Sequence, residues 1–227
     1  MICYVDIEHE KVLHDEGKRI WHLGRRADIK LRLEELSGEP CLLQRYSRIT
    51  RQRLAEWGIR ALVISGNSTD WVEYEDADLA EMLHVIRAAE LPILGLCGGG
   101  QLVAMAHGVA LGPIRRLREG ESDPNPDYSP GYFKEWGYRP VRVVRPDPLF
   151  DGLGKQPVFW QSHYWEMKEV PPGFELLAST DECRIQAIRQ ADKPVYGTQF
   201  HPERYNDEYP DGRKFLVNFF RIAGIIR

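Results

Sequence analysis

The chain of 227 residues lacks several features that would assign it to a class at once. No apolar run approaches the ~18 residues that a membrane span needs. The apolar start at Met1 is short, and Asp6 and Glu8 follow it, unlike a secretory signal. No block of like charge extends beyond a few residues, and the net charge is only −4. We therefore expect no membrane and no nucleic acid among the partners.

Cysteine is scarce and scattered, and one glycine-rich fingerprint is missing. The cysteines form no CxxC pair and no zinc-ligand spacing, so we expect no metal, free thiols and a reducing, cytoplasmic setting. The G-x-G-x-x-G pattern is absent after the first predicted strand, where no glycine precedes Gly17. This absence argues against a dinucleotide cofactor, and we expect no cofactor of any kind. The four cysteines are Cys3, Cys41, Cys97 and Cys183.

The first half of the chain has a regular alternation of apolar strand-like segments and helical patterns. Segment 61–64 has almost no polar alternation, as expected of a strand covered on both faces. Such an alternation predicts a parallel sheet with helices on both sides. The predicted strands are 2–5, 41–43, 61–64 and 92–96, and the predicted helices are 20–36, 50–57, 77–90 and 101–107.

The second half has shorter segments joined by turns such as Pro171-Pro172-Gly173, which predicts partly antiparallel strands. Segment 119–136 is a long loop with several aromatic residues, and it is either a lid or partner surface or a loop packed by its own aromatics. We find no repeat and no linker and expect one domain, 1–227, with an open, largely parallel sheet extended by antiparallel strands. The predicted strands are 138–144, 158–161, 174–178, 184–188 and 195–200, and a helix follows at 214–222.

A cysteine surrounded by glycines, Gly95-Leu96-Cys97-Gly98-Gly99, stands between a predicted strand and a predicted helix. This spacing is typical of a nucleophile elbow, a sharp turn that leaves no room for neighbouring side chains. The helix N-terminus favours a thiolate, and the N–H of Gly98 is free to stabilise an oxyanion. A tight turn around a structural cysteine, or a phosphate cradle, is the alternative.

A thiol nucleophile needs a base, and His201 is the best candidate among the histidines. It follows the predicted strand 195–200, and ligands of parallel sheets bind at the carboxyl ends of strands. Pro202 fixes the backbone so that the carboxylate of Glu203 can orient the imidazole. A surface histidine in a turn is the alternative for His201 taken alone.

Two motifs together resemble class I, triad-type glutamine amidotransferases. Segment 92–101, P-I-L-G-L-C-G-G-G-Q, resembles the nucleophile motif of that family, and 197–203, G-T-Q-F-H-P-E, resembles its second motif. The resemblance implies a flavodoxin-like fold over nearly the whole chain. It also implies that Cys97 attacks the side-chain amide of glutamine, that His201 moves protons and that Glu203 orients His201.

The resemblance implies substrate-binding residues as well. Gln101 matches a residue that contacts glutamine, and 160–165 resembles the segment that holds the α-carboxylate and α-amino groups, which places Ser162, Tyr164 and Trp165 in the site. Asn67 occupies the position of a glycine whose N–H normally helps to form the oxyanion hole, together with Gly98. Since Tyr164 is bulkier than the usual glycine, we expect its ring to fill the space above Gly98 and Gly100.

Three functions follow from these residues. The first is a glutaminase that makes ammonia for a separate synthase, because 227 residues leave no room for an ATP-dependent acceptor domain. The second is a stand-alone γ-glutamyl hydrolase. The third is a non-catalytic relative, against which the intact set of Cys97, His201 and Glu203 argues. We predict the first, with the γ-glutamyl hydrolase as the alternative.

Overall fold

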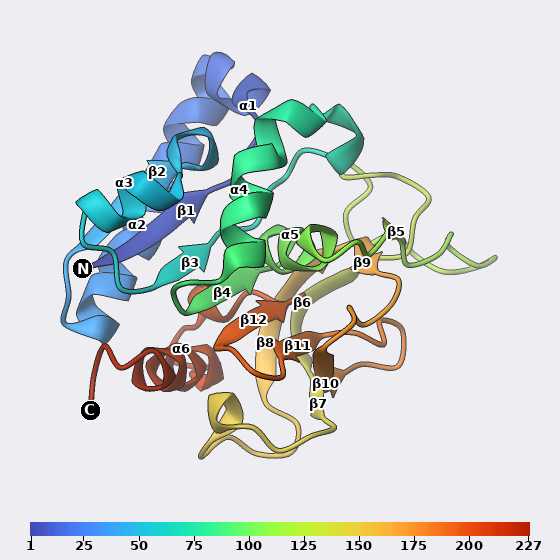
Figure 1. The fold of residues 1–227 in the computed structure, drawn as a ribbon. Helices are drawn as coiled ribbons and strands as arrows, with labels where there is room; N and C mark the ends of the chain where they lie inside the picture. The colour runs from blue at the N-terminus through green and yellow to red at the C-terminus, as the bar shows by residue number, and fades with distance from the viewer.

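The computed structural model describes residues 1–227 and has a central sheet of eight strands in the order β2-β1-β3-β4-β12-β11-β10-β7 (Figure 1). The five strands at one side are all parallel, and the other three are antiparallel to their neighbours. The predicted fold class is therefore confirmed. The strands are β1 (Ile2–Asp6), β2 (Cys41–Arg45), β3 (Leu62–Ile64), β4 (Ile93–Leu96), β7 (Arg142–Val143), β10 (Phe174–Ser179), β11 (Ala187–Gln190) and β12 (Val195–Thr198).

Two small antiparallel pairs stand beside the main sheet, β5 with β9 and β6 with β8. The longer pair brings Glu135 opposite His163 and Trp136 opposite Ser162. These strands therefore connect the loop after β5 to the segment that was predicted to hold substrate. Their bounds are β5 (Leu111–Pro113), β6 (Glu135–Pro140), β8 (Val158–His163) and β9 (Trp165–Met167).

Helices cover both faces of the parallel strands because alternate strand residues point to opposite sides. In Figure 1, α4 and α5 lie in front of the sheet. Short 3-10 segments add η1 (Tyr46–Arg48), η2 (Trp71–Glu73), η3 (Pro148–Phe150) and η4 (Pro202–Arg204). The α-helices are α1 (Glu10–His14), α2 (Glu16–Ser37), α3 (Arg51–Glu56), α4 (Asp76–Ala88), α5 (Gly98–Ala106) and α6 (Asp211–Ile222).

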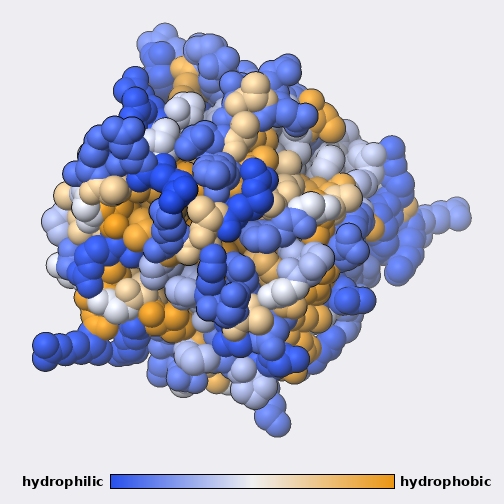
Figure 2. Space-filling model, in the orientation of Figure 1, coloured by the Kyte–Doolittle hydropathy of each residue, from blue (hydrophilic) through white to orange (hydrophobic).

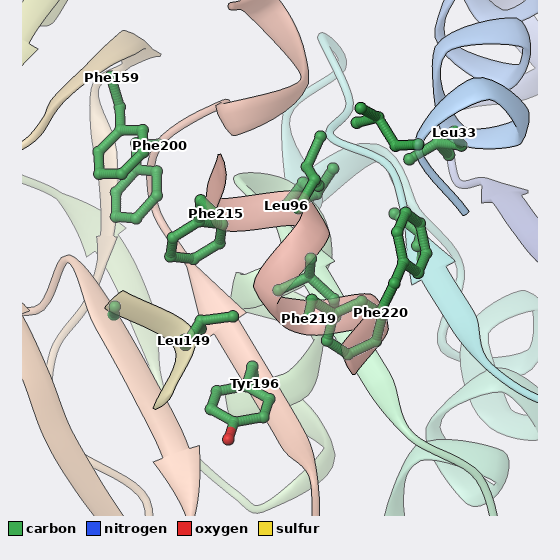
Figure 3. Close-up of a cluster of buried hydrophobic side chains, with 14 of the residues drawn as sticks. Leu33, Leu96, Leu149, Phe159, Tyr196, Phe200, Phe215, Phe219 and Phe220 are labelled. Atoms are coloured by element: carbon green, nitrogen blue, oxygen red, sulfur yellow. The ribbon is translucent and has the colours of Figure 1, made fainter. Parts of the chain in front are cut away.

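Each face of the sheet has its own apolar core. On one face, Tyr4 and Leu96 pack with side chains of α2 and α6, among them Leu33 and Phe219. Figure 3 shows part of this core, in which the rings of Phe159 and Phe200 stack with their centroids 4.1 Å apart. On the other face, alternate residues of the same strands pack against α3, α4 and α5. The covered strands are consequently rigid supports for the loops at their ends.

The structure corrects several predicted boundaries. The helix predicted from Gln101 begins at Gly98, because the glycines pack closely enough to offset their low helix propensity. Segment 138–144 divides into β6 and β7, and the strand predicted at 184–188 lies at Ala187–Gln190. The sequence pattern did not predict α1, β5 or β9, which are only three to five residues long.

Hydrophilic side chains cover most of the face seen in Figure 2, with smaller hydrophobic patches between them. None of the helices combines the length and the apolar character that a membrane crossing requires.

Candidate active site

Cys97 stands at the turn between β4 and α5 with an unusual backbone conformation. Its φ is 52° and its ψ is −109°, a region that residues with a side chain rarely occupy. Such strain persists only where the surroundings enforce it, and it is concentrated at functional sites. The expected sharp turn is therefore present, with the sulfur at the N-terminus of α5.

The glycines around Cys97 allow the first turn of α5 to touch the sheet. A Cβ on Gly99 would lie 2.4 Å from the carbonyl oxygen of Ile64, and a Cβ on Gly100 would lie 2.3 Å from that of Thr198. Real Cβ atoms do not approach other atoms so closely, so a side chain at either position would displace the helix from β3 and β12. Position 100 must therefore be glycine, because the backbone of α5 touches the backbone of β12 there.

His201 and Glu203 follow β12 and come together as predicted. The Nδ1 of His201 lies 2.7 Å from Oε1 of Glu203, and both side chains are buried. The backbone N–H of His201 donates to the carbonyl of Trp160 at 2.8 Å, which ties the turn to β8. Pro202 opens the short η4 helix that carries Glu203. This arrangement fixes the orientation of the imidazole and directs Nε2 away from the carboxylate.

The charges around His201 favour its protonated form. Burial opposes that form, but the charges of Glu203 and Cys97 outweigh it and raise the pKa of His201 to about 10. Burial likewise opposes ionisation of Glu203, yet the charge and hydrogen bond of His201 lower the pKa of that carboxyl. The charges of His201 and Glu203 therefore stabilise each other, and the imidazolium lies beside the Cys97 sulfur.

The loop after β3 brings Asn67 against Gly98. A Cβ on Gly98 would lie 1.8 Å from Oδ1 of Asn67, and all three of its nearest atoms belong to Asn67. The expectation that the Tyr164 ring covers Gly98 and Gly100 is therefore wrong: Asn67 covers the first glycine, and the backbone of Thr198 covers the second.

The backbone of Asn67 is not strained, and its N–H is available. Its φ is not positive, so the substitution of asparagine for glycine requires no special conformation here. Its side chain donates to the carbonyl of Thr69 at 2.7 Å, which fixes the loop. The N–H of Asn67 donates no hydrogen bond within the chain, and the N–H of Gly98 opens α5, where no intrahelical acceptor exists. Two donors thus lie together beside Cys97.

Acidic residues at the end of β1 hold this loop in place. The carboxylate of Glu8 accepts hydrogen bonds from the backbone of Ser68 at 2.7 Å and of Thr69 at 3.2 Å. Arg26 donates to Asp6 at 3.0 Å and to the carbonyl of Gly66 at 2.7 Å. Burial opposes ionisation of Asp6, but its hydrogen bond with His22 and the charge of Arg26 hold its pKa below the usual range.

A small cavity lies over the Cys97 sulfur, with a volume of about 20 Å³. Four of the six predicted binding residues line it, namely Asn67, Gln101, Tyr164 and Trp165. Ser162 and Gly98 do not line it. The other lining residues are Thr69, Asp70, Trp71, Cys97, Tyr128 and His163.

Aromatic rings close this cavity. Tyr128, in the loop between β5 and β6, has its ring 5.4 Å from the ring of Tyr164, and Tyr132 lies at 5.5 Å. The hydroxyl of Tyr164 donates to Asp70, and burial together with this carboxylate raises the pKa of Tyr164 to about 12. The aromatics of this loop therefore pack on the site itself.

A larger, open hollow of about 620 Å³ lies beside Glu203. Trp21 and Arg25 of α2 and Trp160 of β8 form part of its wall. Glu203 lines this hollow and does not line the small cavity.

A second cysteine, histidine and glutamate also come together: Glu135 begins β6, His163 ends β8, and Cys183 lies in the loop between β10 and β11. The ligating atoms of Glu135, His163 and Cys183 lie within 4.8 Å of one another. His163 already uses both ring nitrogens, one 3.0 Å from Glu135 and the other 2.9 Å from the carbonyl of Trp165. Because these groups pair with each other, we assign no metal to them.

The comparisons agree with the fold. A family model described as "Glutamine amidotransferase class-I" matches residues 34–223. That range includes Cys97, His201 and Glu203 and most of the chain. The chain belongs to the class I glutamine amidotransferase family.

Several relatives are named as glutamine-hydrolysing GMP synthases or as subunits of them. The chain is 38% identical over 136 residues to one subunit of the glutamine-hydrolysing GMP synthase of Methanocaldococcus jannaschii, which is 60% of this chain and 62% of that relative. It is 37% identical over 135 residues to the GMP synthase of Caldicellulosiruptor saccharolyticus, covering 59% of this chain and 23% of that protein. The chain thus spans less than two thirds of each of these relatives.

A solved structure supports the fold over almost the whole chain. It is described as a putative GMP synthase subunit of Thermoplasma acidophilum, with a TM-score of 0.71 and 26% identity. The similarity covers 99% of this chain and 94% of the other.

Sequence reasoning missed several residues that shape the site. Gln199 stood inside a recognised motif without a role, although its amide nitrogen lies 3.8 Å from the Cys97 sulfur. Asp6 and Glu8 carried a signal in the sequence, because they end a parallel strand at the edge where ligands bind. Nothing in the sequence alone distinguishes Thr69 and Asp70 from the residues of an ordinary loop.

Proposed function

We propose that this chain hydrolyses the side-chain amide of glutamine to glutamate and ammonia through a thioester on Cys97. The observation that carries the proposal is the placement of Cys97, on a positive-φ turn, against an imidazole that is bonded to Glu203 at 2.7 Å. We further propose that residues 1–227 form one such domain and that it acts in the cytoplasm, since all four cysteines are free thiols.

The residues have distinct roles in this reaction. His201 holds the proton that the Cys97 thiol has given up, and the sulfur of Cys97 forms a bond to the amide carbon. The N–H groups of Asn67 and Gly98 then donate to the oxyanion. His201 returns the proton to the leaving nitrogen, the C–N bond breaks, and ammonia departs. A water then adds to the thioester with His201 as base, and the C–S bond breaks to give glutamate and the thiol.

The cavity contains polar groups suited to an amino acid. The hydroxyl of Thr69 is buried without a partner and lines the cavity together with Asp70. A buried polar group without a partner costs free energy, which a polar substrate group would recover. Thr69 and Asp70 therefore support a small, zwitterionic substrate over an apolar one.

The cavity must enlarge before glutamine enters. Its volume of about 20 Å³ accommodates roughly one water molecule. Tyr128 is the lining residue that comes from a long loop, and its ring rests on Tyr164. We propose that the loop acts as a lid and that a synthase partner favours its open state. The names of the relatives make the partner subunit of a GMP synthase the first candidate for this role.

The test is release of ammonia and glutamate from glutamine by the purified chain, alone and with candidate synthase subunits. We expect hydrolysis that Cys97→Ala abolishes, and a several-fold rise in the unassisted kcat/KM for Tyr128→Ala, which opens the lid. Full activity in Cys97→Ala would overturn the nucleophile, and a lower kcat/KM in Tyr128→Ala would show that Tyr128 binds substrate instead.

The same assay separates the alternative. Larger γ-glutamyl amides and γ-glutamyl peptides are offered in place of glutamine. Preference for glutamine supports the proposal, whereas faster cleavage of the larger compounds without any partner would favour a stand-alone γ-glutamyl hydrolase.

A further inference from the structure

A chain of three hydrogen bonds runs from an indole to the Cys97 sulfur. The Nε1 of Trp71 donates to Oε1 of Gln101 at 2.7 Å, and Nε2 of Gln101 donates to Oε1 of Gln199 at 3.2 Å. The Nε2 of Gln199 then donates to the sulfur of Cys97 at 3.8 Å. The three donors are buried, and Gln199 has no exposed surface. Water therefore does not compete for these bonds.

The direction of this chain is fixed by chemistry. The oxygen and nitrogen of a glutamine amide can exchange places by a flip, so their assignment needs an external reference. Here the indole N–H of Trp71 can only donate, and the carbonyl of Trp165, 3.0 Å from Nε2 of Gln101, can only accept. The indole N–H of Trp71 and the carbonyl of Trp165 together fix the amide of Gln101 in one orientation. Its N–H must meet the oxygen of Gln199, which leaves the nitrogen of Gln199 facing the sulfur.

We propose that Gln199 is a catalytic residue that donates a hydrogen bond to the Cys97 thiolate, and that Trp71 and Gln101 are positioning residues that keep its amide turned that way. The proposal rests on Cys97 as the nucleophile in the proposed function. A hydrogen bond to an anion is stronger than one to a neutral group, so this donor stabilises the thiolate more than the thiol.

An amide suits this position better than a second charged donor. It carries no charge and does not titrate, so it stabilises the thiolate without competing with His201 for the proton. The backbone N–H of Gln199 donates to the carbonyl of Gln186 at 2.8 Å, which anchors the residue to the sheet. The side chain is thus held at both ends, one by the backbone and the other by Gln101.

The experiment measures the pH dependence of Cys97 alkylation by iodoacetamide, with the modified residue identified by mass spectrometry. In Gln199→Met, which keeps the size and removes the donor, we expect the midpoint of the rate–pH curve to rise by about one pH unit. Alkylation below both midpoints then slows by roughly tenfold. In Gln199→Glu the carboxylate repels the thiolate, and we expect a larger rise.

Trp71→Phe tests the direction of the chain without touching the sulfur. It keeps the ring but removes the indole N–H, so the carbonyl of Trp165 alone still orients the amide of Gln101. We expect a rise of the midpoint in the same direction and of smaller size. The matched control is Gln161→Met, an equally buried glutamine whose amide donates to Gln186 and does not reach Cys97. Its midpoint should equal that of the unmodified chain.

The outcomes separate this proposal from the proposed function. An unchanged midpoint in both Gln199→Met and Trp71→Phe, in a chain that hydrolyses glutamine, overturns the role of Gln199 and leaves the function standing. A raised midpoint in a chain that releases no ammonia under any condition supports the hydrogen bond and overturns the function. If Gln199→Met does not fold, the ordering of Gln199→Glu and Trp71→Phe against the control decides.

Discussion

The chain brings a cysteine, a histidine and a glutamate together in two places. One group, at the sheet edge, is Cys97, His201 and Glu203, and the other, beside β8, is Cys183, His163 and Glu135. We call them the first set and the second set. In the first, His201 has one ring nitrogen on Glu203 and the sulfur as its other neighbour. In the second, His163 has both ring nitrogens bound to oxygen atoms. Only the first has an imidazole free to move a proton to and from a thiol.

The surroundings of the two thiols differ just as much. Cys97 lies at a helix N-terminus on a strained turn, whereas the thiol of Cys183 donates to the carbonyl of Ile185 at 3.6 Å. Burial, followed by the negative charge of Glu135, raises the pKa of Cys183 well above its usual value. The comparison shows that residue types alone do not define a nucleophile. A nucleophile is defined by the backbone conformation of the cysteine and by the hydrogen-bond partners of its sulfur and of the histidine nitrogens.

The largest expected effect comes from replacing each of the two cysteines by alanine. We expect Cys97→Ala to lower glutamine hydrolysis by about 10³-fold or more, with little change in the free energy of unfolding. Cys183→Ala should keep hydrolysis within about threefold and lower the free energy of unfolding by about 1 kcal/mol, because it only removes a buried contact. Ammonia release and urea unfolding measure the two quantities. Equal losses of activity in both variants would remove the distinction between the sets.

Replacing the histidine of each set by glutamine gives the second largest expected effect. We expect His201→Gln to lower kcat by roughly 10²–10⁴-fold, since it removes the acid and base. His163→Gln should leave kcat within about tenfold and raise KM for glutamine, because the carbonyl of Trp165, which lines the cavity, loses one of its two side-chain donors. Steady-state kinetics with glutamine separate the two parameters. A fall in kcat as large in His163→Gln as in His201→Gln would give the second set a chemical role.

The glycine turn belongs to the first set alone. Gly98→Ala should lower hydrolysis by roughly tenfold, because its Cβ would meet Oδ1 of Asn67 at 1.8 Å. Adding Asn67→Gly should restore activity to that of Asn67→Gly alone, since the clash is then removed. Gly154→Ala is the control, as a Cβ there meets nothing within 4 Å. If the double variant is no better than Gly98→Ala, the two positions are not coupled through this contact.

The same contrast explains what the sequence could predict. The first set was found because its parts are local: a cysteine among glycines in one short segment, and His201 two residues from Glu203 in another. The fold class followed from the alternation of buried strands and helices, which the two apolar cores now explain. Local motifs and periodicity carry this information because they depend on backbone geometry and burial.

The second set was not visible because its members come from three separate segments. Only the register of β6 against β8 brings Glu135 opposite His163, and no spacing along the chain encodes that register. The contact of the Asn67 side chain with Gly98 was missed for a similar reason. The sequence showed that Gly98 lacks a side chain where space must be filled. The residue that fills this space is Asn67, in the loop after β3, and not Tyr164.

The smallest effect concerns stability and pH. The pKa of Glu203 is lowered from 4.5, so its stabilising contribution is present above that pH and is lost as the pH falls through the folded value. The pKa of His201 is raised from 6.5 to about 10, so its contribution is complete below pH 6.5 and is lost as the pH rises toward 10. Both contributions are therefore complete only between about pH 4.5 and 6.5.

We accordingly expect Glu203→Gln to lower the free energy of unfolding by about 1–3 kcal/mol in that window, and by less toward pH 10. Urea unfolding of both chains at a series of pH values gives the difference directly. Glu119→Gln, an exposed carboxylate without an ion pair, is the control and should show no pH-dependent difference. A difference that stays constant up to pH 10 would mean that Glu203 stabilises the fold by packing, and that the charge of His201 does not distinguish the first set from the second.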